Sequence, residues 1–193
     1  MEAFLASTLV VALAEIGDKT QLLSLLLAAR YRKPLPIILG ILVATLANHA
    51  LAGALGAWLR SLLAPEVLRW IVGVSLLGIA AWSLKPDKLE GEVKESTRYG
   101  VFALTCVVFF LAEMGDKTQI ATIVLAAKYD ALMLVVIGTT LGMMIANVPV
   151  VYLGSAASHR IPFRAVRIVA ALLFAGLGVL GLGGVELTYE TSE

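Results

Sequence analysis

Residues 4–29 read FLASTLVVALAEIGDKTQLLSLLLAA, an apolar stretch interrupted near its middle by the charged motif E-I-G-D-K-T-Q at residues 15–21. About 20 helical residues cross the hydrocarbon layer of a bilayer, so this stretch is long enough to span a membrane. It has no basic amino-terminal region and is longer than the apolar core of a signal peptide. We therefore predict a retained membrane helix with charged residues inside it.

The composition of the whole chain favours a membrane protein. Of the 193 residues, 60% are hydrophobic and 15% are charged, a balance that is unsuited to a water-exposed surface of this size. A net charge of +1 gives no reason to expect nucleic-acid binding. One cysteine excludes an intramolecular disulfide, and two histidines are too few for a histidine-rich zinc site.

Five further apolar stretches complete the predicted architecture, an all-α integral membrane protein. The six transmembrane helices are expected at residues 4–29, 35–59, 67–84, 101–127, 131–156 and 165–186. The polar segment 86–99 is the predicted linker between the third and fourth spans, and residues 188–193 form a short tail.

The charged motif occurs twice, which predicts an internal repeat. The second copy, E-M-G-D-K-T-Q at residues 113–119, follows the first at an offset of 98 residues, and the same offset aligns Tyr31 with Tyr129. We expect two three-helix repeats, at 1–85 and 100–187. Because three spans is an odd number, the second repeat would enter the membrane from the opposite side, so the repeats would be inverted.

The distribution of lysine and arginine predicts the orientation. Ten of these residues fall on the side of the first, third and fifth connections, whereas only Arg60, Arg69 and Lys128 fall on the other side. The positive-inside rule then puts the linker in the cytoplasm and both termini outside.

The acids of each motif are expected near the middle of the membrane. A rise of 1.5 Å per residue places Glu15 and Asp18 roughly 16 to 21 Å into the layer, and Glu113 and Asp116 at a similar depth. Charges at that depth cost several kcal/mol each unless they are paired or hydrated, so intramembrane acids indicate a functional site.

Other oxygen-bearing side chains follow the acids at helical spacing and would support an ion site. These residues are Thr20, Gln21, Ser24, Thr118, Gln119 and Thr122. Carboxylate, amide and hydroxyl oxygens suit hard cations such as Mn²⁺, Ca²⁺ or Mg²⁺. Each motif carries one negative net charge, so one divalent cation would neutralise the pair. Without it, the acids would take up protons, which is the physical basis of cation/proton exchange.

A structural ion pair within each motif is the alternative interpretation. Glu15 with Lys19, and Glu113 with Lys117, have the favourable i, i+4 order on a helix. This leaves the two aspartates without an obvious partner. The lysines could keep the empty site neutral, respond to protonation, or only lock two helices together.

Three polar residues inside the second and fifth spans are candidates for the ion pathway. His49 and Asn147 occupy matching positions in the repeat, and Asn48 is adjacent. A hydrogen-bonded packing role is an equal alternative for all three.

Glycines beside the motifs and in the neighbouring spans predict close packing or bending. Gly17 and Gly115 would let another backbone approach the acids or let the helix bend. The small-xxx-small patterns that begin at Gly40 and Gly138 are typical of helix-packing contacts.

The paired motifs resemble those of the Gdt family of cation/proton exchangers, which includes bacterial MneA-type manganese exporters and shares a duplicated E-x-G-D-K/R-T/S signature. The resemblance covers essentially the whole chain. It implies transport of Mn²⁺ or Ca²⁺ coupled to protons, with the four acids as ion ligands and Thr20, Thr118, Gln21 and Gln119 as support. The compact form, without an organelle-targeting extension, is similar to the manganese-exporting branch of the bacterial inner membrane.

We therefore expect a secondary transporter, not an enzyme, that exports Mn²⁺, with Ca²⁺ as the other fitting ion, in exchange for protons by alternating access. Its partners would be the cation, protons and the lipid bilayer; no cofactor or nucleic acid is expected, and a homo-oligomer is left open. One alternative is an exporter of a small cationic organic solute such as an amino acid. A membrane-embedded enzyme is a distant alternative, because the motif lacks the full phosphate-loop pattern.

Overall fold

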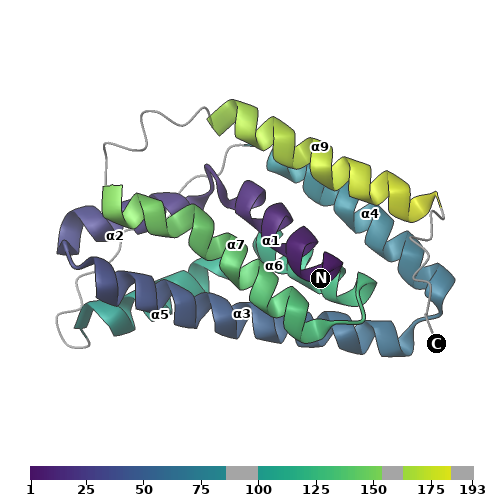
Figure 1. Cartoon of the computed structure of the whole chain (residues 1–193), viewed down its shortest axis with the longest axis horizontal. Helices are drawn as coiled ribbons and strands as arrows, with labels where there is room; N and C mark the ends of the chain where they lie inside the picture. Colours follow the sequence, from purple (N-terminus) through teal and green to yellow (C-terminus); the bar gives the residue numbers. More distant parts are fainter. Residues whose placement is uncertain (86–99, 154–162, 184–193) are drawn as a thin grey trace.

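A computed structural model describes residues 1–85, 100–153 and 163–183, and within these ranges all regular structure is helical (Figure 1). The predicted linker 86–99, the tail 188–193 and the ends of the last two predicted spans lie outside the described residues. The helices are α1 (Glu2–Glu15), α2 (Lys19–Tyr31), α3 (Pro34–Leu62), α4 (Pro65–Ser83), α5 (Gly100–Glu113), α6 (Lys117–Lys128), α7 (Leu132–Leu153) and α9 (Phe163–Leu182).

The surface of the molecule is apolar, the reverse of a water-soluble protein. Helices α3 and α4, and residues Leu132–Tyr152 of α7, are long and apolar enough to cross a membrane by length and composition. Large apolar side chains such as Met133 and Leu172 remain 69% and 67% exposed, while the four acids of the two motifs are buried. Because lipid is the solvent that suits this distribution, the chain is an all-helical integral membrane protein.

Both motif-bearing spans are broken, so the expectation that residues 4–29 and 101–127 form continuous helices is wrong. The first span is divided into α1 and α2 and the second into α5 and α6, each at its motif. Gly17 and Gly115 have φ angles of 82° and 72°, a left-handed conformation that glycine adopts without steric cost. A Cβ built on Gly115 would meet no atom within 4 Å, so this glycine serves the backbone bend and not a close approach.

Each broken span packs along one long helix from the other half of the chain. Helix α7 contacts α1 at Gly138 and α2 at Ala146, so the α1–α2 segment and α7 run in the same direction. Likewise, α3 contacts α5 at Gly40 and α6 at Gly56. The two halves of the chain are therefore interlocked.

The same glycine contacts occur in both halves. A Cβ built on Gly138 would lie 2.6 Å from the carbonyl oxygen of Phe4, and one on Gly40 would lie 3.0 Å from that of Phe102. Both residues of the first contact are 98 positions from their counterparts in the second. The close helix packing predicted from the small-residue patterns is confirmed.

Helices α4 and α9 pack side by side and cover one part of the molecule (Figure 1). Together with α1 and α6 they build most of one apolar cluster, which contains Val10, Leu76 and Phe174. A second cluster, with Leu27 and Phe109, is drawn mainly from α2, α3, α5 and α7. Each motif thus lies where the chain passes from the helices of one cluster to those of the other.

Gly142→Ala is expected to destabilise the protein. Its new Cβ would lie 2.5 Å from the carbonyl oxygen of Thr8 and 2.9 Å from the amide nitrogen of Ala12, so α1 or α7 must shift. Overpacking of this kind costs about 1–3 kcal/mol and should lower the midpoint of thermal unfolding in detergent by several degrees. In Gly78→Ala, the matched control, the Cβ enters open space. Equal shifts for both variants would contradict the packing argument.

Substitutions at Gly115 test the backbone conformation of the helix break alone, because a side chain added there would clash with no neighbouring atom. An alanine held at positive φ costs about 1–2 kcal/mol, whereas asparagine tolerates this conformation better. The expected order of unfolding midpoints is therefore glycine, then Gly115→Asn, then Gly115→Ala. An alanine variant as stable as the asparagine variant would show that the break does not depend on the left-handed residue.

Candidate functional site

The four acids of the two motifs lie in the interior, at the two helix breaks. Glu15, Asp18 and Glu113 are fully buried and Asp116 is 1% exposed. Carboxylate oxygens of Glu15, Asp18 and Asp116 lie within 4.8 Å of one another, a separation that one cation could bridge. The site therefore combines residues of both motifs, with Glu113 outside the group of three.

The motif lysines form ion pairs between the two halves. Lys117 Nζ lies 2.9 Å from Asp18 Oδ1, and Lys19 Nζ lies 3.0 Å from Asp116 Oδ1. The expectation that the aspartates lack partners is thus wrong. The physical reason is the helix break between glutamate and lysine, which removes the regular turn that i, i+4 pairing within a motif requires.

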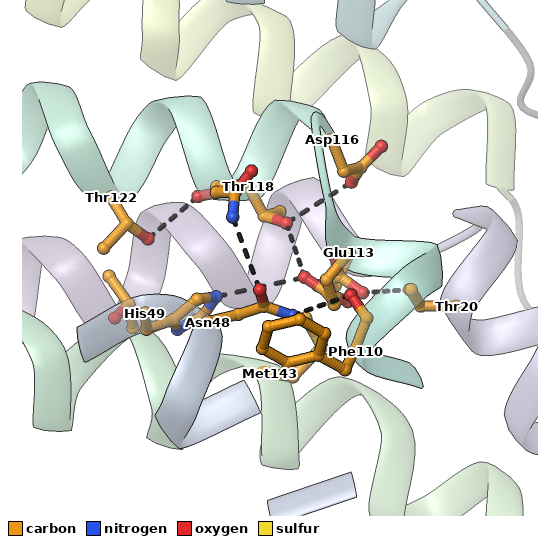
Figure 2. Close-up of polar contacts among 12 residues, drawn as sticks. Thr20, Asn48, His49, Phe110, Glu113, Asp116, Thr118, Thr122 and Met143 are labelled. Atoms are coloured by element: carbon orange, nitrogen blue, oxygen red, sulfur yellow. Dashed lines mark hydrogen bonds and ion pairs between the residues drawn. The ribbon is translucent and has the colours of Figure 1, made fainter. Parts of the chain in front are cut away.

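Each motif threonine donates a hydrogen bond to the glutamate of its own motif. Thr20 Oγ1 bonds Glu15 Oε2, and Thr118 Oγ1 lies 3.3 Å from both Glu113 Oε2 and Asp116 Oδ2 (Figure 2). The other oxygen of each glutamate, Oε1, is buried and has no hydrogen-bond partner in the part of the chain that the structure describes. A proton or a cation could satisfy these oxygens.

The motif glutamines brace the breaks. The side-chain oxygen of Gln21, and that of Gln119, accepts a hydrogen bond from the N–H of its motif glycine, at 2.9 and 2.7 Å. Their amide nitrogens reach the other half, where Gln21 donates to the Ala146 carbonyl at 3.0 Å and Gln119 to Asn48 Oδ1 at 3.4 Å. Both side chains hold the two halves in register around the acids.

Ser24 and Thr122, two of the predicted supporting residues, make hydrogen bonds away from the acids. Ser24 Oγ donates to Asn147 Oδ1 at 2.6 Å, and the amide nitrogen of Asn147 donates to the Met143 carbonyl at 3.1 Å. Thr122 Oγ1 donates to the Thr118 carbonyl of its own helix at 2.8 Å (Figure 2). Because the helix breaks separate these residues from the glutamates, they support the helices next to the site.

Two of the pathway candidates lie beside the second motif. Asn48 donates to the Phe110 carbonyl at 3.0 Å, in the last turn of α5. His49 Nε2 lies 4.0 Å from Glu113 Oε2, and neither ring nitrogen has a hydrogen-bond partner among the described residues (Figure 2). Phe110 and Ala146 could not be predicted from the sequence, because each contributes a backbone carbonyl that any residue type would offer.

Comparison with known proteins identifies a family. The model of the divalent cation/proton antiporter GDT1 family matches residues 3–91 and 101–186. A Vibrio cholerae protein named as a candidate manganese exporter is 57% identical over 175 residues, which cover 90% of this chain and 87% of that protein.

More distant relatives carry the GDT1-like name. One from Synechocystis is 31% identical over 90% of this chain and 93% of its own length. Another, from Oryza sativa, is 33% identical over 92% of this chain and 72% of its own length. No solved structure matches the chain.

The family model covers both motif-bearing halves, and the relatives align over nearly the whole chain. The chain therefore belongs to the GDT1 family of divalent cation/proton antiporters and is a transporter, not an enzyme.

Proposed function

We propose that this antiporter exports Mn²⁺ from the cytoplasm in exchange for protons, and that one site built from both motifs carries the ion. The convergence of buried carboxylates from Glu15, Asp18 and Asp116 supports this most directly. The similarity to a protein named for manganese export favours Mn²⁺ over Ca²⁺ as the main substrate. An organic cation, the alternative drawn from the sequence, has no such support.

Almost all of the proposed ligand oxygens for a hard cation are carboxylate oxygens. Glu15, Asp18, Glu113 and Asp116 are the proposed ligands, and the unshared Oε1 atoms of the glutamates are the oxygens that an arriving ion would find open. Thr20 and Thr118 orient the opposite oxygens of these glutamates. The remaining polar residues hold the breaks in place.

Charge balance couples the ion to protons. Four acids and two lysines give the site a net charge of −2, which one divalent ion neutralises. When the ion leaves, two protons on the buried carboxylates restore neutrality at far lower cost than two uncompensated charges. We therefore expect exchange of about two protons per divalent ion.

The crossed lysines pair with the aspartates of the site. Lys117 and Lys19 each hold one aspartate through an ion pair, so an incoming cation competes with two tethered ammonium groups. Such competition gives the transporter a way to release its ion, because the lysines can return to the aspartates as protons reach the glutamates.

We propose six membrane crossings in two inverted repeats, with each broken span counted as one crossing. Helices α1 and α2 contain 14 and 13 residues, and α5 and α6 contain 14 and 12, so each pair together exceeds the length that a bilayer requires. The recurrence of contacts at the 98-residue offset supports the repeat. The lysine and arginine distribution supports termini outside the bacterial inner membrane.

Alternating access in this arrangement would be a movement of one group of helices against the other. The α4–α9 pair packs on α1 and α6, and α2 and α5 pack on α7 and α3; because α7 and α3 also pack on α1 and α6, they would have to slide along these helices. The motifs lie between these groups, so a rocking of one against the other would open the site first to one side and then to the other.

Neutralising a site acid should abolish exchange. In proteoliposomes, Glu15→Gln and Asp116→Asn are each expected to reduce Mn²⁺-driven proton movement by at least about tenfold, because one ligand and one proton site are lost together. Glu66→Gln, which removes an exposed acid on α4, is the control and should transport normally. Full activity in both site variants would refute the assignment.

Removing a lysine should strengthen ion binding. Lys117→Gln is expected to tighten Mn²⁺ binding, measured by titration calorimetry in detergent, by about tenfold, because a charged hydrogen bond no longer competes for Asp18. Lys19→Gln should act in the same direction but less, since Lys19 is 26% exposed and Lys117 only 3%. Unchanged or weaker binding in both variants would show that the lysines only hold the two halves of the chain together and do not compete with the ion.

A further inference from the structure

A cavity of about 600 Å³ lies at one end of the molecule and contains no residue of either motif. It forms where the start of α1 and the ends of α3, α6 and α9 meet the first turns of α4. The proposed transport cycle makes no use of it.

The charges around this cavity are mostly positive. Arg60, Arg69 and Lys128 line it, and these are the three basic residues that the sequence assigns to the outer side of the membrane. Glu2 is the lining acid and accepts a hydrogen bond from the Tyr129 hydroxyl at 3.3 Å. The lining therefore carries a net charge of +2, which disfavours a divalent cation as its ligand and favours an anion.

The basic groups retain capacity for a ligand. Arg60 Nη1 donates to the Lys128 carbonyl at 3.2 Å, and Arg60 Nη2 lies 3.5 Å from Asp130, whose side chain is 89% exposed. A pair this exposed is weak. Arg69 forms no ion pair with any residue that the structure describes.

The remainder of the wall is apolar, and exposed tryptophans lie on the turns beside it. Leu68, Val72 and Leu177 line the cavity between α4 and α9. Trp58 and Trp70, on the neighbouring turns of α3 and α4, are 57% and 52% exposed. Exposed tryptophans of this kind are typical of the bilayer interface, where lipid headgroups lie.

We propose that this cavity binds an anionic phospholipid of the outer leaflet, with its phosphate at Arg60, Arg69 and Lys128 and an acyl chain against the apolar wall between α4 and α9. A free phosphate would fill only the charged part, and an uncharged lipid only the apolar part. The lipid would contact α3, α4, α6 and α9 together and so hold the α4–α9 pair against the rest of the protein. The site is independent of the proposed substrate and of the motifs.

Lipid-dependent thermal stability of the purified protein tests this proposal without any transport assay. Phosphatidylglycerol titrated into the protein in mild detergent is expected to raise the unfolding midpoint saturably. Arg69→Gln should weaken the apparent affinity about fivefold, and Arg69→Gln with Lys128→Gln by more, because each basic residue near a headgroup favours anionic lipid by about that factor. Lys33→Gln, which removes an exposed charge outside the cavity, is the control and should bind normally.

Three outcomes would overturn the proposal. Equal stabilisation by phosphatidylcholine would show that the headgroup charge is not recognised. Equal stabilisation by glycerol phosphate would show that the apolar wall contributes nothing. Unchanged phosphatidylglycerol affinity in both cavity variants would place the lipid elsewhere on the surface.

Discussion

The crossed ion pairs between Lys117 and Asp18 and between Lys19 and Asp116 are the interaction on which the centre of this protein depends. Four carboxylates buried in an apolar bundle would repel one another and lose their hydration. Two lysines, each supplied by the opposite motif, offset half of that charge. Removal of one partner would leave its aspartate buried and uncompensated, so the pairs also tie the two halves of the chain together.

The helix breaks follow from the same constraint. A continuous helix would direct Glu15 and Lys19 to one face and pair them locally. The left-handed glycine ends α1 at the glutamate and starts α2 at the lysine, so the lysine can reach across to the other motif. The break also places each aspartate at the N-cap position of the new helix, where the helix dipole favours negative charge.

Much of the architecture could be predicted because lipid imposes it. Apolar length predicted the long helices α3, α4 and α7, and the 98-residue offset that predicts a repeat recurs in the packing of Gly40 and Gly138. The helix breaks could not be predicted from apolarity, because the residues on either side remain equally hydrophobic. The crossed pairs could not be predicted either, because spacing along a chain identifies neighbouring side chains only on a continuous helix. The acids themselves could be predicted as site residues, because charged side chains inside an apolar span are costly and therefore indicate a functional site.

The two halves are similar but not equivalent, and the differences surround the second glutamate. Glu113 lies outside the group of three carboxylates and faces His49, whereas the position of His49 in the other half is Asn147, which is hydrogen-bonded to Ser24. Lys117 is almost fully buried and Lys19 is not. If an inverted-repeat transporter changes its facing by exchanging the conformations of its halves, identical halves would give two states of equal energy. Here a histidine and a more exposed lysine make the halves unequal, so the ion-free protein should favour one facing over the other.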